Sequence, residues 1–271
     1  MTVRPPTETT RIAAPDMGRA YDDYFKTGLY TQRYPAPNRR VLRTALGLLP
    51  RGGRFIDYGA GTGRYCLPMI EVQGATCIAF DISAVALDCL AERNAGLVAG
   101  GRLVLTGPKM ADLEAAIDRG GPVDLVMLAF GVLGHVAGRR QRLALLRGLK
   151  SMLVPGGSLL LGVPNALRRF RRAQRDNRAA VADGRLEPGD ILYRRAAADH
   201  EIDLYYHLYT LDEIRHDVEQ AGFVVETVTA ESALPEHAVV CHPHLGQLDD
   251  WVSGLVPVRL AYGFLIIARR V

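Results

Sequence analysis

Apolar residues along this chain form short runs that alternate with segments of helical spacing. The five runs typical of buried strands lie at 54–58, 76–80, 102–106, 124–130 and 158–163. The segments whose apolar residues recur with helical spacing lie at 63–73, 83–96, 110–118 and 139–153. This alternation predicts an α/β fold in which helices cover both faces of a mostly parallel sheet.

The alternation is interrupted after the fifth strand and then resumes. Residues 165–205 are rich in Arg, Ala and Asp and poor in large apolar groups, so they predict an insertion or cap. A helix over 211–222 and strands over 223–230 and 261–270 are expected after it. Residues 231–258, with their prolines and the only tryptophan, predict a long irregular segment.

The N-terminal part of the chain precedes this pattern. Residues 1–16 lack periodicity and predict a mobile arm, whereas residues 39–49 predict a helix that stops before Pro50. We therefore expect an arm and lid helices over 1–49 and a single domain over 50–271. The length of 271 residues suffices for one large α/β domain with an insertion.

Composition narrows the class of protein only slightly. Apolar residues make up 48% of the chain, and the net charge of +4 permits an anionic partner without arguing for nucleic acid. No apolar run is long enough for a membrane span, and no N-terminal stretch is typical of a signal peptide. The four cysteines lack CxxC spacing, which favours free thiols. These features predict a cytoplasmic protein without a membrane partner.

The first strand leads into a glycine-rich turn, FIDYGAGTGRY at residues 55–65. Gly59, Gly61 and Gly63 let the backbone turn sharply and approach a ligand closely. The helix that follows offers unpaired N–H groups to an electron-rich partner. The spacing differs from the GxGxxG of dinucleotide sites, and a glycine-rich turn without any ligand stays open as an alternative.

The second strand ends at Asp81, about 20 residues beyond the glycines. A carboxylate at this tip can accept both hydroxyl groups of a ribose. Asp81 could instead cap the helix that begins near Ala84, where Ser83 is the expected N-cap. Together with the glycine turn, Asp81 favours the ribose interpretation.

These segments, with residues 128–136 and 153–165, resemble the successive signature motifs of class I S-adenosylmethionine-dependent methyltransferases. The resemblance spans about residues 50–165, and more weakly 206–229 and 262–270. It implies a Rossmann-like sheet of seven strands with a reversed final hairpin. It also implies S-adenosylmethionine as cofactor and S-adenosylhomocysteine as product.

The resemblance assigns cofactor contacts position by position. Asp57 would lie near the methionine ammonium, Asp81 would bind the ribose and Ile82 would lie beside the adenine. The acid that the family often carries after strand three is absent here or displaced, so Met110 and Asp112 are candidates for that position. The full set of expected cofactor residues is Tyr24, Asp57, Tyr58, Gly59, Ala60, Gly61, Gly63, Asp81, Ile82, Met110, Asp112, Ala129, Phe130 and Val132.

Fewer features of the sequence identify residues that would contact the methyl acceptor. The resemblance places His135 facing the acceptor, and a hydrogen bond to a loop carbonyl is the alternative. Four tyrosines before the core, Tyr21, Tyr24, Tyr30 and Tyr34, suggest a lid over the cofactor. Tyr205 and the two residues after it would stand near the same edge or belong to a plain edge strand. The expected catalytic residues are His135, Tyr30, Tyr34, Tyr206 and His207.

Two further features of the sequence, Arg33 and a pair of histidines, bear on ligand binding. Arg33 could bind a carboxylate bidentately or could be a surface charge. The two histidines within residues 241–246 have no carboxylate close by in the sequence, so we expect no metal site there.

The leading hypothesis is methyl transfer to a small metabolite by in-line displacement. Tyrosine faces would suit a cationic or thioether acceptor, hence S- or N-methylation of an amino-acid-like molecule. A tRNA wobble-uridine methyltransferase is the first alternative, because residues 168–180 form a basic cluster. A non-catalytic subunit that binds the cofactor is the second, and homo-oligomerisation stays open.

Overall fold

The computed structural model of this chain describes residues 12–197 and 199–271. The expected N-terminal arm therefore falls mostly outside the described residues. Three helices precede the first strand: α1 Met17–Lys26, α2 Leu29–Arg33 and α3 Arg39–Leu48. The side chain of Asn38 caps α3, because its Oδ1 accepts from the backbone N–H of Arg40 at 3.0 Å.

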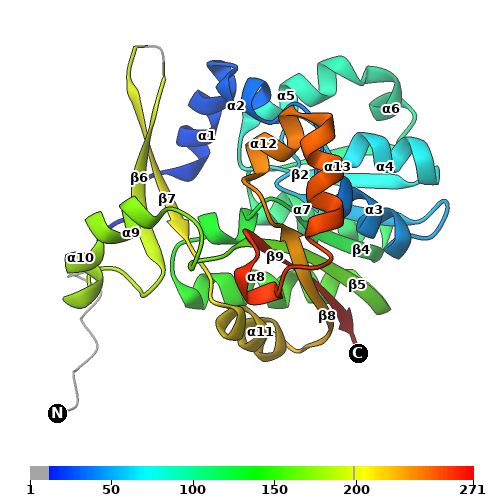
Figure 1. The fold of residues 1–271 in the computed structure, drawn as a ribbon. Coiled ribbons are helices and arrows are strands. Elements are labelled where there is room, and N and C mark those ends of the chain that lie inside the picture. Colours follow the sequence, from blue (N-terminus) through cyan, green and yellow to red (C-terminus); the bar gives the residue numbers. More distant parts are fainter. Residues whose placement is uncertain (1–11, 198) are drawn as a thin grey trace.

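A seven-stranded sheet forms the centre of the molecule (Figure 1), with strand order β3-β2-β1-β4-β5-β9-β8. Its strands are β1 Arg54–Tyr58, β2 Thr76–Phe80, β3 Leu103–Thr106, β4 Val123–Leu128, β5 Leu153–Pro164, β8 Phe223–Ser232 and β9 Gly263–Arg270. Strands β1 to β5 pair in parallel, whereas β9 runs antiparallel to both of its neighbours, β5 and β8. The predicted Rossmann-like sheet with a reversed final hairpin is confirmed.

Helices bury both faces of this sheet, as the apolar strands require. One face packs against α7 Met110–Gly120, α8 Arg139–Met152 and α11 Leu211–Gln220. The other face packs against α3, α4 Cys66–Gln73 and Leu90 of α5 Ala84–Arg93. A short helix α6, Ala95–Ala99, follows α5. The carboxyl ends of the parallel strands are thus left as the open edge where ligands bind in such sheets.

The expected N-cap Ser83 is confirmed, and Thr210 caps a second helix. Ser83 Oγ accepts from the backbone N–H of Ala86 at 3.2 Å at the start of α5. Thr210 forms a capping box with Glu213 at the start of α11, since each side chain accepts from the backbone N–H of the other residue. These caps fix where the helices begin relative to the strand ends.

The insertion after β5 contains α9 Arg171–Asp176, α10 Arg178–Ala182 and a two-stranded antiparallel sheet of β6 Asp190–Ala196 and β7 Glu201–His207. It therefore ends two residues beyond the predicted range. This hairpin stands apart from the seven-stranded sheet and lies beside α1 (Figure 1). Apolar residues of α1 and β7 form a small core of their own, which joins the N-terminal helices to the insertion.

The prediction of an irregular segment over 231–258 is wrong. It contains α12 Glu236–Cys241 and α13 Pro243–Val252, before the short 3-10 helix η3 Val258–Leu260. Pro243 occupies the first turn of α13, where a missing N–H costs nothing. Buried Asp249 accepts from the backbone N–H groups of Ala233 and Leu234 at 2.9 and 2.8 Å, which ties α13 to the end of β8.

The length and hydropathy of each helix indicate whether it could cross a membrane. Over residues 12–197 and 199–271, no helix combines the length and the apolar character that crossing a bilayer requires.

Gly63 provides a test of this packing. A Cβ at Gly63 would lie 2.7–2.8 Å from Leu90 and Leu67, at a φ of +92°. We expect Gly63→Ala to lower the free energy of unfolding by about 1–3 kcal/mol more than Gly52→Ala. Gly52 shares a positive φ of +70° but has no atom within 4 Å of such a Cβ, so it isolates the backbone strain. Urea unfolding of both variants measures the difference, and equal losses would contradict the packing argument.

Candidate active site

A pocket lies where β1, β2 and β4 end, beneath α1 and α2. It encloses about 830 Å³ of space, part of which opens to solvent. The expected cofactor residues that form its walls are Tyr58, Gly59, Ala60, Gly61, Asp81, Ile82, Ala129, Phe130 and Val132. His135 and Tyr30, expected at the acceptor side, also line it. The structure thus brings most of the predicted site residues together.

The glycine turn follows the edge of this pocket closely. The backbone N–H groups of Gly59 and Ala60 donate to the carbonyl of Phe80 at 2.7 and 3.0 Å, which holds the turn against the end of β2. A Cβ at Gly59 would lie 2.5 Å from Val132, and one at Gly61 would lie 3.2 Å from Phe25. Both glycines have positive φ, so side chains here would be strained and would fill the pocket.

Asp81 lies at the same edge with both carboxylate oxygens engaged. Oδ2 accepts from the backbone N–H of Gly61 at 2.7 Å, and Oδ1 accepts from that of Ser83 at 2.8 Å. Burial raises the pKa of Asp81 to about 6, while these hydrogen bonds act in the opposite direction. Ser83 in turn donates to Asp22 of α1 at 2.7 Å, which fixes α1 over the pocket.

Asp57 is buried in β1 just behind the pocket walls. Among the described residues, its Oδ2 atom has no hydrogen-bond partner. Burial and the nearby Asp81 raise the pKa of Asp57 to about 7, and Arg64 only partly offsets this. An unpartnered carboxylate oxygen at this depth would be stabilised by a cation.

The expected lid tyrosines form two layers. Tyr21 and Tyr30 line the pocket itself. Tyr24 lies behind Tyr30 with ring centres 5.6 Å apart, and Tyr34 packs edge-on against Phe130 at 4.5 Å. Burial raises the pKa of Tyr30 to about 12, so its phenol stays neutral.

His135, on the 3-10 helix η2 Val132–His135, is both a pocket wall and part of a hydrogen-bond chain. Its Nδ1 lies 2.9 Å from the carbonyl oxygen of Tyr205, and its Nε2 lies 2.8 Å from the hydroxyl of Tyr21. Burial lowers the pKa of His135 to about 4, so the ring is neutral: Nδ1–H donates to Tyr205 and Nε2 accepts from Tyr21. The Tyr206 ring stacks on it, 4.3 Å away and tilted by 15°.

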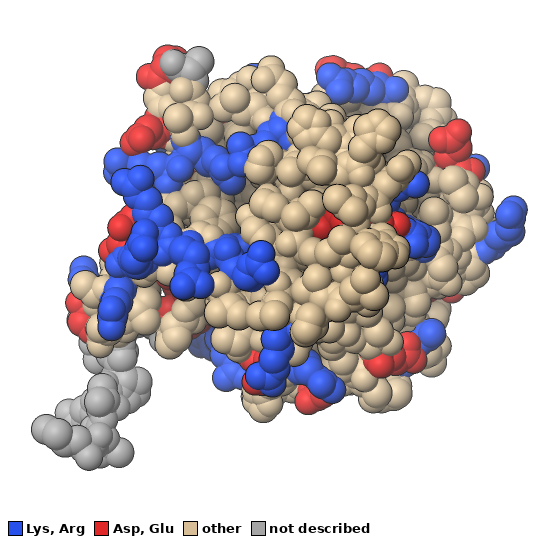
Figure 2. All heavy atoms as spheres, in the orientation of Figure 1, with Lys and Arg blue, Asp and Glu red and all other residues tan. Residues whose placement is uncertain are grey.

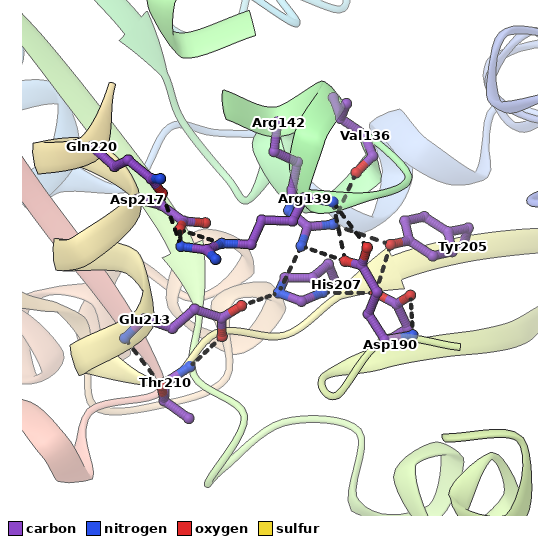
Figure 3. Close-up of polar contacts among 11 residues, drawn as sticks. Val136, Arg139, Arg142, Asp190, Tyr205, His207, Thr210, Glu213, Asp217 and Gln220 are labelled. Atoms are coloured by element: carbon purple, nitrogen blue, oxygen red, sulfur yellow. Dashed lines mark hydrogen bonds and ion pairs between the residues drawn. The ribbon is translucent and has the colours of Figure 1, made fainter. Parts of the chain in front are cut away.

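His207 does not reach the pocket. It lies in a cluster with Arg142 and several acids, which Figure 3 shows between α8, α11 and the hairpin. Its Nδ1 contacts Asp190 at 2.7 Å and its Nε2 contacts Glu213 at 2.8 Å. Burial alone would lower the pKa of His207, but these two hydrogen bonds outweigh it and raise the pKa.

The same cluster contains the one group of possible metal ligands found among residues 12–197 and 199–271: Glu187, Asp190 and His207. Arg142 disfavours a cation there, because its Nη2 lies 3.0 Å from Glu187 and 3.3 Å from His207 Nε2. Tyr205 donates to Asp190 at 2.6 Å, so the cluster braces the strand whose carbonyl holds His135.

Besides Asp57, four expected cofactor residues lie outside the pocket walls: Tyr24, Gly63, Met110 and Asp112. Met110 and Asp112 lie at the start of α7, where Asp112 accepts from the backbone N–H of Lys109 at 3.1 Å. Gly63 faces Leu67 and Leu90 in the helix–strand packing.

Several pocket residues were not among the predicted site residues: Phe25, Thr62, Arg64, Tyr65, Phe80 and Val136. Arg64 had a signal in the sequence, because it directly follows the glycine motif. Its guanidinium lies 4.4 Å from the centre of the Phe130 ring and 4.9 Å from that of Tyr65. The aromatic residues had no comparable signal.

Comparison with known proteins agrees with this geometry. Residues 30–228 match the family model of a methyltransferase domain. The fold is shared with a SAM-dependent methyltransferase from Methanosarcina mazei, at 17% identity and a TM-score of 0.60, covering 84% of this chain and 97% of that one. It is shared with the CcbJ methyltransferase from Streptomyces caelestis, at 16% identity and a TM-score of 0.57, covering 86% and 90%.

A third structure, the complex of the Haloferax volcanii Trm112 methyltransferase activator with a methyltransferase, gives 15% identity and a TM-score of 0.56 over 96% of this chain and 99% of that one. Curated protein sequences give no significant match. The chain belongs to the family of methyltransferase domains. Its fold is that of solved S-adenosylmethionine-dependent methyltransferases.

The residues present fit this cofactor. Asp57 offers an unpartnered carboxylate oxygen to a cation, and Asp81 presents a fixed carboxylate at the end of β2. Gly59 and Gly61 keep the turn free of side chains at positive φ, since a Cβ would clash with Val132 at Gly59 and press on Phe25 at Gly61. A ligand can therefore approach the backbone of this turn closely.

The raised pKa of Asp57 predicts how the stability of the protein depends on pH. Its pKa in the folded state is raised above that in the unfolded chain, so its contribution to stability is full at low pH and is lost as pH rises through about 7. Between pH 5 and 8 we expect wild-type stability to fall by about 2–3 kcal/mol relative to Asp57→Asn, which cannot ionise. Urea unfolding at both pH values measures this, and parallel pH curves would contradict it.

The lowered pKa of His135 can be tested by spectroscopy. We expect its ring to stay neutral down to about pH 5, whereas hydrogen bonds to Asp199 and Asp23 raise the pKa of the His200 ring. Nuclear magnetic resonance of the histidine rings follows both groups in one titration. A midpoint for His135 at or above the ordinary histidine value of about 6.5 would disprove the buried, doubly bonded geometry.

Proposed function

We propose that this enzyme transfers the methyl group to a small-molecule acceptor that enters beside the aromatic wall of the pocket. The proposal rests on one observation: Tyr21 and Phe25 of α1 and Tyr30 of α2, from the chain's own N-terminal helices, line the pocket. α1 in turn packs against β7 of the insertion. An amino-acid-like molecule methylated on sulfur or nitrogen fits a pocket of this kind.

We assign the cofactor-binding roles to residues that line the pocket and to Asp57, which lies just behind its walls. Asp57 would face the ammonium group, Asp81 the ribose hydroxyls and Ile82 the adenine. Arg64, a guanidinium in the pocket wall, suits the carboxylate of the methionine part. When bound, S-adenosylmethionine supplies an electrophilic methyl group on a sulfonium, so the protein has to align a nucleophile and exclude water.

The remaining pocket residues serve alignment and water exclusion. Tyr21, Phe25 and Tyr30 cover the pocket from the N-terminal side, while Phe130 closes the side of β4. Neutral His135 holds the Tyr21 hydroxyl and carries no proton on Nε2. If Tyr21 rotates away, Nε2 can accept a proton from an acceptor that must lose one. Tyr34, Tyr206 and His207 support these groups from behind.

A nucleic-acid acceptor is favoured by one specific observation. Arg171, Arg172 and Arg175 of α9 are exposed, and basic side chains gather on the face that carries this helix and the hairpin (Figure 2). Filter binding of bulk tRNA at two salt concentrations tests it, because phosphate binding weakens steeply with salt. Absence of binding at both concentrations removes the RNA acceptor.

A non-catalytic role as a cofactor-binding subunit is excluded if the isolated protein transfers methyl groups.

Asp81→Ala tests the cofactor site. Loss of charge-assisted hydrogen bonds should weaken binding of S-adenosylhomocysteine by about 1–3 kcal/mol, or roughly 5- to 150-fold. Calorimetric titration measures it, and Asp88→Ala on the exposed side of α5 serves as the matched control. Gly61→Val should abolish binding, since its side chain would enter the pocket at a positive φ. Unchanged affinity in both site variants would refute the assignment.

A further inference from the structure

A second hollow adjoins the cofactor pocket and has a basic lining. It lies between α2, the β6–β7 hairpin and α12, with about 1000 Å³ of space that is continuous with solvent. Arg33, Arg194, Arg195 and His237 line it, and none of its described lining residues is acidic. Tyr24 belongs to its wall and packs against Tyr30 of the cofactor pocket, so the two hollows share a wall of tyrosines.

Arg169 lies deeper, behind Tyr206. It is only 9% exposed, and within the described part of the chain its guanidinium has no hydrogen bond or ion pair with a carboxylate; its Nε is buried without a partner. It contacts aromatic rings instead, with the guanidinium carbon 5.0 Å from the ring centre of Tyr262 and 5.8 Å from that of Tyr206. A buried cation without a carboxylate partner is unfavourable until an anion arrives.

Arg195 is similar but more accessible. Its Nε is also buried without a partner, and its guanidinium lies 5.5 Å from the centre of the Tyr193 ring. Arg169 contacts Tyr206, whose ring stacks on His135, and Arg195 contacts Tyr193, whose ring centre lies 6.5 Å from that of Tyr206. Both arginines also contribute to lowering the pKa of His135, after the larger effect of burial. The neighbouring Arg194 differs, because Glu201 and Asp203 pair with it.

The acids that face this region do not cancel its charge. Glu231 and Glu236 are the nearest carboxylates, and burial raises the pKa of both, Glu231 further through its neighbour Glu236. The pKa of Glu231, raised to about 8, leaves this acid mostly protonated at neutral pH, so Glu231 does not neutralise Arg169. Glu236 lies 4.0 Å from Arg64 and pairs with that guanidinium.

These arginines also occupy the aromatic faces that a cationic acceptor would need. Arg64 covers Phe130, Arg169 covers Tyr206 and Tyr262, and Arg195 covers Tyr193. A second cation would meet repulsion at each of these rings, whereas a carboxylate or phosphate would meet planar donors suited to bidentate binding.

We propose that Arg169 and Arg195 form an anion subsite for the methyl acceptor, which is a small molecule that bears a carboxylate or phosphate group. This inference rests on the proposed function and specifies its substrate class. The hollow lined by Arg33 and Arg195 is the route by which the anion reaches Arg169. The acceptor's nucleophilic atom then lies toward His135 and the cofactor pocket.

The first experiment separates acceptors by charge. A metabolite extract, filtered to remove macromolecules, is divided on an anion-exchange resin at about pH 9, and each fraction is incubated with the protein and labelled S-adenosylmethionine. We expect the labelled product to come from the retained fraction. Prior phosphatase treatment of that fraction distinguishes the two sources: loss of product identifies a phosphate, and its persistence identifies a carboxylate.

The second experiment assigns the residues. In Arg195→Gln, we expect the amount of retained fraction that gives half the maximal rate to rise at least tenfold. The matched control Arg194→Gln should stay within twofold of wild type. Arg169→Lys keeps the charge but not the bidentate fork, and it should show an intermediate rise. Affinity for S-adenosylhomocysteine, measured by calorimetry, should be unchanged in all three variants.

The outcomes separate this inference from the function on which it rests. If S-adenosylhomocysteine fails to bind the wild-type protein, the proposed function itself is wrong. If it binds but product comes only from the unretained fraction, or from neither fraction, the anion subsite is overturned. Unaltered half-saturation in both Arg195→Gln and Arg169→Lys would also overturn it.

Discussion

The carboxylate of Asp81 is the interaction on which the site depends. One oxygen fixes the glycine turn through the N–H of Gly61, and the other fixes the start of α5 through that of Ser83. Ser83 then holds Asp22 of α1. A single buried group therefore sets the relative positions of the turn after β1, the helix after β2 and the helix that covers them. Its own pKa is raised by burial, so the arrangement persists because backbone donors surround it.

Burial also holds titratable groups of the site in unusual protonation states. Burial pushes Asp57 toward the protonated form and His135 toward the neutral form, and both shifts would be relieved by ligand charge or solvent. The Arg142–His207 cluster shows the opposite solution, since each charged group there has a partner of opposite sign. The contrast distinguishes groups kept ready for a ligand from groups that hold the fold together.

Local patterns predicted most of the fold and many of the residues that line the pocket. The glycine turn and Asp81 are adjacent in space because parallel strands end at a common edge, which the alternation of elements already implied. The burial of Arg169 could not be predicted from the basic cluster of residues 168–180, because it depends on the tertiary positions of Tyr206 and Tyr262. Likewise, residues 231–258 fold as helices since Asp249 is captured by the end of β8, a long-range contact that no local pattern contains.

The β6–β7 hairpin makes its strand hydrogen bonds within its own pair and not with the seven-stranded sheet. Side chains on it can therefore be exchanged during evolution without shifting the register of β1, β2 or β4. Descendants of a common ancestor could keep one methyl donor while their hairpins diverge to accept new molecules. For protein engineering, the same separation makes the exposed side chains of β6 and β7 positions that can be changed while the pairing of the seven-stranded sheet is kept.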